Sequence, residues 1–213
     1  MLRAMLACLV FAPVSMAQCN PLTPAQTEGP YFKAGSPLKV DFRPDAATPN
    51  WLHLVFDGTV VGPNCLPLQN AKIDLWHANE LGQYDNAPGS YKMRGHVFTN
   101  ACGEFHFDTI VPGLYPGRTR HMHVKVTPAG GGGATLTTQM YFPGEPQNQT
   151  DPLYNPALEM KVTQTPTDWV GTFGFIKSEA GASTCVCAAD CDLSGGLNID
   201  DFICFQTLFA IGC

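Results

Sequence analysis

The feature that most constrains this chain is a succession of short β-branched or alternating apolar runs that turn-forming residues separate. No long amphipathic helix interrupts the succession, and 21 glycines and 18 prolines are available for turns. Repeated strands of this length usually stack as two sheets or close as a barrel, so the pattern predicts an all-β fold, and we favour an antiparallel β-sandwich. The expected strands are 52–61, 71–76, 95–99, 104–110, 120–127, 134–142 and 169–176, with a glycine-rich connection at 130–133.

Length and charge narrow the class of function. A chain of 213 residues can bury one full core and a small second module, but not two ordinary domains. The formal net charge is −6 and no run of Lys or Arg occurs, which disfavours nucleic-acid binding and electrostatic attachment to a membrane. A small, weakly charged ligand fits this composition better.

Residues 1–17 have the pattern of a secretory signal peptide. Arg3 precedes an apolar stretch, and the small residues Ser15 and Ala17 occupy the two positions that a signal peptidase inspects. The apolar stretch is too short to span a bilayer, and no later stretch approaches about 18 apolar residues, so we expect no membrane span. We therefore expect a bacterial protein that is secreted or associated with the cell surface.

The cysteines indicate how the chain is organised. Removal of the leader would leave eight of the nine cysteines, an even number that suggests disulfide bonds in an exported protein. Three lie in the expected β-sandwich domain, 18–177, and five lie in a C-terminal module, 185–213, beyond a small polar linker at 178–184. Both counts are odd, so if every cysteine pairs within the chain, at least one bridge joins the two parts. The sequence does not say which one.

His121 and His123 give the strongest local chemical signal. Residues i and i+2 of a strand share a face and lie roughly 6.5 Å apart, so both imidazoles can reach one metal ion. Alternatively, they are surface or hydrogen-bonded histidines of an ordinary strand. Tyr84 and Tyr115 lie in Gly-rich turns, where ligands are often presented, although a tyrosine can also serve there through packing or a hydroxyl hydrogen bond.

Short motifs occur in a fixed order along residues 27–144. They are Thr-Glu-Gly-Pro-Tyr-Phe at 27–32, Ile-Asp-Leu-Trp-His-Ala-Asn at 73–79, Gly-Gln-Tyr at 82–84, Arg-Gly at 94–95, Gly-Glu-Phe at 103–105, Thr-Ile-Val-Pro-Gly-Leu-Tyr at 109–115, His-Met-His at 121–123 and Thr-Gln-Met-Tyr-Phe at 138–142. Each motif alone is weak, but the ordered set is specific. With this set the body resembles the intradiol ring-cleavage dioxygenases, the family of catechol and protocatechuate dioxygenases, in a secreted single-domain form.

The resemblance implies a mononuclear, non-haem Fe(III) held by Tyr84, Tyr115, His121 and His123. Phenolates are hard anionic donors that stabilise Fe(III), whereas two histidines with one carboxylate suit Fe(II) oxygenases. The resemblance also implies the reaction: a catechol-type aromatic diol and O₂ give a muconate-type diacid, with the ring opened between its two hydroxylated carbons. In that scheme Tyr115 leaves the iron when substrate binds and accepts a proton.

Two further residues receive catalytic roles from the resemblance. Arg118 matches the family's arginine beside the substrate ring, where its charge would stabilise developing anionic character. Arg120 is a rival, but strand alternation places it on the face opposite His121, which favours Arg118. Gln139 matches the family's glutamine near iron and substrate. Without these roles, Arg118 would be an exposed arginine at a strand start and Gln139 a half-buried polar strand residue.

Residues 190–201 fit a twelve-residue calcium loop, with oxygen donors at loop positions 1, 3, 5, 9 and 12 and Gly195 at the sharp turn. The donors are Asp190, Asp192, Ser194, Asn198 and Asp201. Because Asp201 replaces the usual bidentate Glu, residues 188–213 resemble the GC-type dockerin segments of secreted bacterial proteins. The resemblance implies a Ca²⁺ ion and attachment to a protein or cell-surface anchor. The alternative is an acidic cap tied by disulfides.

Two other functions compete with the dioxygenase. A cupin-like enzyme could also use a His-x-His pair, but it would usually need another histidine and a carboxylate, and the two placed tyrosines speak against it. The non-enzyme alternative is a secreted β-sandwich binding or scaffold protein, anchored through a calcium-binding tail, whose metal site has decayed. The four intact ligand candidates weaken that alternative. The choice among catechol, hydroxyquinol and protocatechuate stays open.

Overall fold

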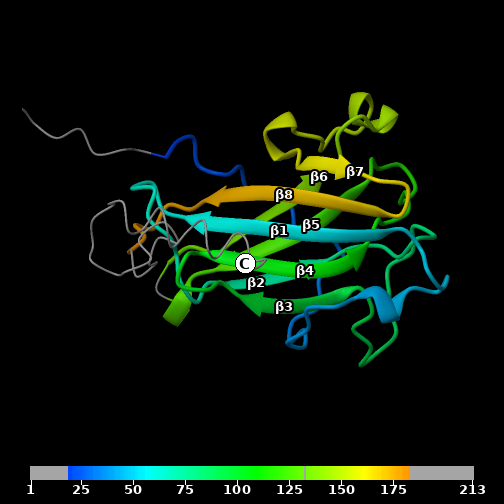
Figure 1. The fold of residues 1–213 in the computed structure, drawn as a ribbon, viewed down its shortest axis with the longest axis horizontal. Coiled ribbons are helices and arrows are strands. Elements are labelled where there is room, and N and C mark those ends of the chain that lie inside the picture. Colours follow the sequence, from blue (N-terminus) through cyan, green and yellow to red (C-terminus); the bar gives the residue numbers. More distant parts are fainter. Residues whose placement is uncertain (1–18, 132, 183–213) are drawn as a thin grey trace, which may run out of the picture.

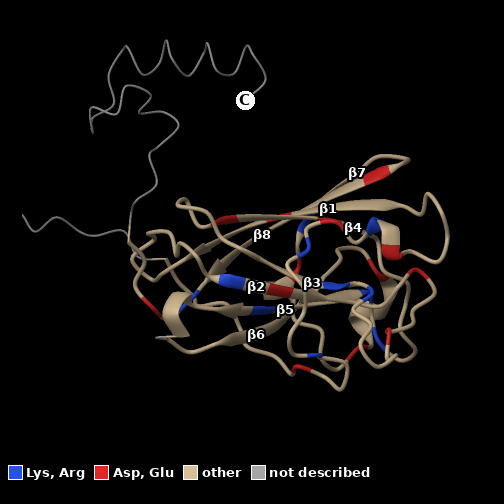
Figure 2. Cartoon of the chain, turned by 90° about the horizontal axis from the view of Figure 1, so that it is seen from below, with Lys and Arg blue, Asp and Glu red and all other residues tan. Residues whose placement is uncertain are grey.

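The computed structural model describes residues 19–131 and 133–182, which form two four-stranded sheets stacked face to face (Figures 1 and 2). One sheet has the strand order β4-β1-β8-β7 and the other has the order β3-β2-β5-β6. The strands are β1 (His53–Val61), β2 (Lys72–Trp76), β3 (Arg94–Phe98), β4 (Glu104–Ile110), β5 (His121–Thr127), β6 (Leu136–Tyr141), β7 (Lys161–Gln164) and β8 (Asp168–Ile176). Short 3-10 turns lie at Arg43–Asp45, Ala129–Gly131, Pro146–Gln149 and Pro156–Leu158. The predicted β-sandwich is confirmed.

The core between the sheets follows from the two-residue period of the strands. On β1, Leu54, Phe56 and Val60 point inward and are fully buried. On β5, Met122 and Val124 also point inward, while His121 and His123, which alternate with them, face the opposite side of the sheet. That opposite side is also buried, because the chain before β1 covers it. The sheet β3-β2-β5-β6 therefore has two covered faces, and a site can form between its outer face and the covering chain.

The strand pattern differs from the sequence prediction in two ways. Strand β8 runs parallel to β1, with His53 opposite Asp168 and Val61 opposite Ile176, whereas an antiparallel sandwich was expected. The chain between β1 and β8 passes through the other sheet, so no hairpin fixes their relative direction. The edge strand β7 was not expected, because its four residues are largely exposed and carry no apolar run.

Residues near both ends of the described chain are tied to the body. Cys19 forms a disulfide with Cys65, and Cys102 is also disulfide-bonded. Residues 178–182, the start of the predicted linker, run along the body. Asn64 Nδ2 donates to the carbonyl oxygen of Gly181 at 2.9 Å, and the Gly181 N–H donates to Asn64 Oδ1 at 2.9 Å.

Several sequence predictions fall on other parts of the chain. The predicted signal peptide, 1–17, and the predicted C-terminal module, 185–213, with its five calcium donors, lie outside the described residues. Within the described ranges, no helix is long and apolar enough to cross a bilayer. Export, calcium binding and anchoring therefore stay predictions.

Candidate metal and substrate site

Strands and turns from distant parts of the chain meet on the outer face of the sheet β3-β2-β5-β6. The start of β5 supplies His121 and His123, and the neighbouring strand β6 supplies Gln139 directly opposite His123. The turn after β2 supplies Tyr84, and the turn between β4 and β5 supplies Tyr115. Together they line one cavity of about 220 Å³. Its lining residues are Thr27, Gly29, Pro30, Tyr31, Tyr84, Tyr115, Arg118, His121, His123, Gln139 and Leu153.

Two glycines allow the tyrosine-bearing turns to approach each other. Gly82 has φ of 74°, and a Cβ atom there would lie 2.1 Å from the carbonyl oxygen of Leu114. A Cβ atom at Gly113 would lie 2.3 Å from the carbonyl oxygen of Glu80. Because both turns lack side chains at these points, the rings of Tyr84 and Tyr115 come within 5.7 Å of each other.

The two histidines are oriented by different contacts. His121 Nδ1 lies 2.7 Å from the carbonyl oxygen of Thr119, to which it can only donate, so Nε2 keeps its lone pair and lies 3.3 Å from Tyr84 Oη. His123 stacks on Trp76, with ring centroids 4.9 Å apart and planes 9° apart. The centroids of the two imidazole rings are 5.0 Å apart. No residue of the described chain bonds the buried Nδ1 of His123.

Burial controls the ionisation of these groups. Each histidine is only 4% exposed, and burial lowers the pKa of His121 to about 4 and holds the pKa of His123 well below its usual value. Both imidazoles are therefore neutral near pH 7, which is the form that binds a metal. Burial also raises the pKa of Tyr84 far above that of a free phenol, so a phenolate there requires a nearby cation. Two neutral imidazoles and two tyrosines that can ionise to phenolates fit a hard, highly charged ion such as Fe(III).

Tyr31 is a site residue that the sequence analysis did not select. Its hydroxyl lies 2.8 Å from the Tyr115 hydroxyl, and this hydrogen bond raises the pKa of Tyr31. Its ring stacks on Tyr84, with centroids 4.3 Å apart and planes 10° apart. The available signal was the motif at 27–32, where Gly29 has φ of 70° and a Cβ atom would lie 3.4 Å from His123 Cε1. A tight glycine turn against a cavity histidine brings the next residues of the motif into the site.

The two rival arginines point to different places. Arg118 lines the cavity, donating from Nη2 to Gln139 Oε1 at 2.7 Å and from Nε to Asp151 Oδ2 at 2.8 Å. Arg120 donates from Nε to Glu145 Oε1 at 2.5 Å and does not line the cavity. The structure thus brings Arg118, and not Arg120, to the predicted ligands. Asp151 was not expected, because it lies 33 residues from Arg118 and no local pattern links them.

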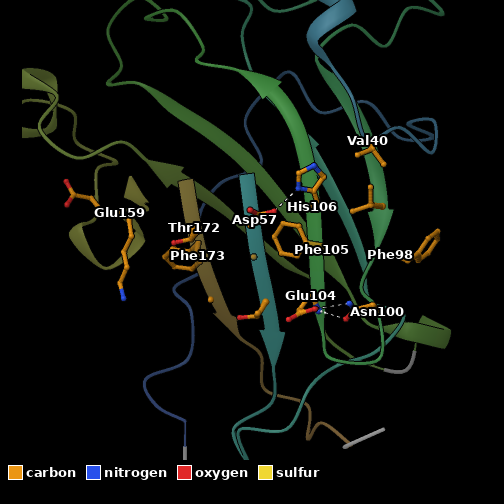
Figure 3. Close-up of a pocket in the computed structure, with 15 residues that line it drawn as sticks. Val40, Asp57, Phe98, Asn100, Glu104, Phe105, His106, Glu159, Thr172 and Phe173 are labelled. Atoms are coloured by element: carbon orange, nitrogen blue, oxygen red, sulfur yellow. Dashed lines mark hydrogen bonds and ion pairs between the residues drawn. The ribbon is translucent and has the colours of Figure 1, made fainter. Parts of the chain in front are cut away.

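A larger hollow among the described residues lies elsewhere, on the sheet β4-β1-β8-β7 (Figure 3). It has a volume of about 910 Å³ and is wide open, with Asp57 and His106 side by side on neighbouring strands and Phe98 at its edge. No tyrosine lines it. Since the smaller cavity gathers all six predicted side chains of the iron site and its surroundings, we take that cavity as the candidate site.

Comparisons with known proteins define the class. The dioxygenase domain of a dioxygenase–carbohydrate-binding protein fusion from Streptomyces sp. SirexAA-E is 46% identical, with a TM-score of 0.68, covering 76% of this chain and all of that domain. Catechol 1,2-dioxygenase from Acinetobacter sp. ADP1 is 27% identical, with a TM-score of 0.63, over 74% of this chain and 63% of that one. A protein-family model described as Dioxygenase matches residues 27–169. The chain belongs to the intradiol ring-cleavage dioxygenase family.

The catechol and chlorocatechol dioxygenases are less similar to this chain than the Streptomyces domain is, and they extend beyond the part that this chain matches. Catechol 1,2-dioxygenase of Acinetobacter baylyi is 30% identical over 157 residues, which is 62% of this chain and 50% of that enzyme. Chlorocatechol 1,2-dioxygenase of Rhodococcus opacus is 29% identical over 155 residues, 61% of this chain and 60% of that enzyme. The chain spans about half the length of the first of these relatives. The dockerin-like tail lies beyond the matched residues 27–169 and is not confirmed.

Proposed function

We propose that the protein is a secreted, Fe(III)-dependent intradiol dioxygenase that cleaves a catechol-type aromatic between its two hydroxylated carbons with O₂ and yields a muconate-type diacid. The observation that carries the proposal is the gathering of Tyr84, Tyr115, His121 and His123 around one cavity. The names of the relatives, catechol and chlorocatechol 1,2-dioxygenases, support the same reaction class. A cavity of about 220 Å³ can enclose a single aromatic ring but leaves little room for large substituents.

Tyr84, Tyr115, His121 and His123 would hold the iron. Bound there, Fe(III) supplies Lewis acidity toward the two oxygens of a catecholate. Stacking on Trp76 fixes the His123 ring, and the Thr119 carbonyl fixes the tautomer of His121, so both imidazoles are held in place for an ion that would bind there.

The remaining side chains handle protons, charge and position. Tyr115 accepts a proton that the diol loses on binding, and the Tyr31 hydroxyl, 2.8 Å away, holds the resulting phenol. Arg118 presents its guanidinium to the cavity, where it stabilises negative charge that develops on the ring during cleavage. Gln139 donates from Nε2 to the Thr27 carbonyl oxygen at 3.1 Å and accepts from Arg118, so it links the covering segment to the arginine.

The proposal extends to location and organisation. We propose a signal peptide at 1–17, a catalytic domain at 18–177, a linker at 178–184 and a module at 185–213 that binds Ca²⁺ and attaches to a protein or cell-surface anchor. The Cys19–Cys65 disulfide supports an oxidising compartment. Calorimetric titration of the full chain with Ca²⁺ tests the module, and an absence of binding heat would refute its calcium site.

The visible absorption spectrum and the iron content of the purified protein test the iron site directly. We expect a broad visible tyrosinate-to-iron band that moves to longer wavelength when catechol is added without oxygen. Tyr84→Phe should lose iron or the band, whereas the control Tyr91→Phe should keep both, because Tyr91 donates to the Ala34 carbonyl oxygen outside the cavity. A colourless protein that stays free of iron after reconstitution would overturn the proposal and favour the non-catalytic binding protein.

A further inference from the structure

Asp151 is a buried carboxylate that accepts three hydrogen bonds. It follows the turn Pro146–Gln149 between β6 and β7, and its side chain is 1% exposed. Oδ2 accepts from Arg118 Nε at 2.8 Å and from the Thr119 N–H at 2.9 Å, and Oδ1 accepts from the Leu153 N–H at 2.9 Å. A buried charge with three donors is strongly held in place, because each bond to an ionised acceptor is short and directional.

The two bonds to Oδ2 reach the candidate site by separate routes. Through Arg118, the carboxylate fixes the guanidinium whose Nη2 reaches Gln139 at 2.7 Å on the cavity wall. Through Thr119, it fixes the backbone whose carbonyl oxygen bonds His121 Nδ1 at 2.7 Å. Asp151 itself does not line that cavity. One oxygen atom therefore sets the direction of a cavity cation and the backbone support of a metal-ligand candidate.

We propose that Asp151 is a positioning residue for ring cleavage, an inference that rests on the proposed function. Asp151 does not itself line the cavity, and it acts by aiming the Arg118 guanidinium into the cavity while holding the Thr119 backbone against His121. An arginine is suited to this arrangement because its planar fork bonds an anchor with one nitrogen and a target with another. A lysine at the same position offers only a single point of charge.

A second arginine–carboxylate pair in the same region is a matched control. Arg120 donates from Nε to Glu145 at 2.5 Å, and both side chains are mostly buried, as in the pair of Arg118 with Asp151. Neither Arg120 nor Glu145 lines the cavity. If any broken ion pair near β5 lowered activity by loosening the fold, Glu145→Gln would have the same effect as Asp151→Asn.

Asp151→Asn preserves shape but cannot accept all three bonds, because its NH₂ group must face at least one backbone or guanidinium donor. We expect kcat for catechol cleavage to fall about tenfold to a hundredfold, less than the loss of a transition-state donor itself. Iron content and the visible spectrum should be retained, and KM should stay within about threefold of wild type. Glu145→Gln should stay within about twofold in kcat.

A double-mutant cycle tests whether the effect passes through Arg118. In an Arg118→Met background, Asp151→Asn should lower kcat by less than about threefold, since its target is already gone. If Asp151→Asn does not fold, Arg118→Lys replaces it and should show the same tenfold or larger loss with iron retained.

Three results would overturn the positioning role: an Asp151→Asn kcat equal to that of Glu145→Gln, full loss in both backgrounds of the cycle, or loss of iron in proportion to activity. If Arg118→Lys is the variant used, wild-type activity would overturn it. A wild-type protein that holds iron but cleaves no catechol would overturn the proposed function together with this role. An active wild type beside an unaffected Asp151→Asn would overturn the role alone.

Discussion

The two sheets each carry a histidine cluster, and the clusters have opposite chemistry. On β5, His121 and His123 are 4% exposed and lie among aromatic rings, and no carboxylate of the residues that the structure describes is within ion-pairing distance of either. On β4, the His106 side chain is 47% exposed and bonds Asp57 at 2.7 Å (Figure 3). It also lies 3.3 Å from Asp108. The histidines are thus buried away from water on one sheet, whereas the histidine on the other sheet is paired with carboxylates.

The difference decides what each imidazole can do. Burial is the main cause that lowers the pKa of His121 to about 4, so the ring is neutral and offers a lone pair. At His106, partial desolvation lowers the pKa, but the bonds to Asp57 and Asp108 outweigh it, and the net pKa is raised. A neutral imidazole is a metal ligand, whereas a protonated one is half of an ion pair. The position of a histidine on a strand therefore does not define its function; the groups around the imidazole ring do.

The largest expected effect is the difference in bound iron between a variant of a β5 histidine and a variant of the β4 histidine. His123→Gln should lower bound iron and catechol cleavage by about a hundredfold or more, because a direct ligand matters at least as much as its supporting shell. His106→Gln should leave both within about twofold. Iron per chain, measured by elemental analysis, and oxygen consumption report the two quantities. Full iron in His123→Gln would remove this histidine from the ligand set and break the comparison.

The next effect is the pH dependence of the free energy of unfolding in the iron-free protein. His77 tests the contribution of a buried histidine that is not a candidate metal ligand. His77 is fully buried outside the candidate site, with Nδ1 2.7 Å from the Ala78 carbonyl oxygen and Nε2 2.7 Å from Thr109 Oγ1. Burial lowers its pKa to about 4, against 6.5 in the unfolded chain. The unfolded state therefore binds the proton first, so stability is complete above pH 6.5 and falls toward pH 4, by about 3 kcal/mol for one such histidine.

Urea unfolding of the iron-free protein across this pH range measures the slope. His77→Gln should reduce the loss of stability between pH 6.5 and pH 4, while its stability at neutral pH is lower because the two hydrogen bonds are changed. His106 contributes with the opposite sign: its raised pKa gives a small stabilisation that is present below pH 6.5 and is lost as pH rises through the folded-state pKa. An unchanged slope in His77→Gln would show that other groups control acid unfolding.

Local periodicity predicted the parts of the site that lie on one strand or in one turn. The two-residue spacing of His121 and His123 was sufficient to place both rings on one face, and the same alternation favoured Arg118 over Arg120. The ordered motifs indicated that Tyr84 would join them, which no strand period could show. The sandwich followed from repeated short strands because their apolar faces must be covered.

Long-range contacts were beyond the sequence. Asp151 meets Arg118 only because the chain after β6 folds back across the start of β5, and nothing local in the sequence records that return. Tyr31 meets Tyr115 across 84 residues for a similar reason. The parallel pairing of β1 with β8 depends on the path of the whole intervening chain, so alternation within each strand could not reveal its direction.

The smallest expected effect sharpens the comparison on the charge-paired side. Asp57→Asn removes the closer of the two carboxylates from His106, so the pKa of His106 should fall, though not completely, because Asp108 remains 3.3 Å away. The free energy of unfolding should change by only about 0.5 kcal/mol or less, since both side chains of the pair are nearly half exposed and solvent screens them.

An NMR titration of the His106 ring protons measures the pKa. Asp168→Asn is the control, because Asp168 bonds His53 and not His106. If the pKa of His106 is the same in Asp57→Asn as in wild type, ion pairing with Asp57 does not set the charge of this ring, and the contrast with the buried pair on β5 would rest on desolvation and on Asp108.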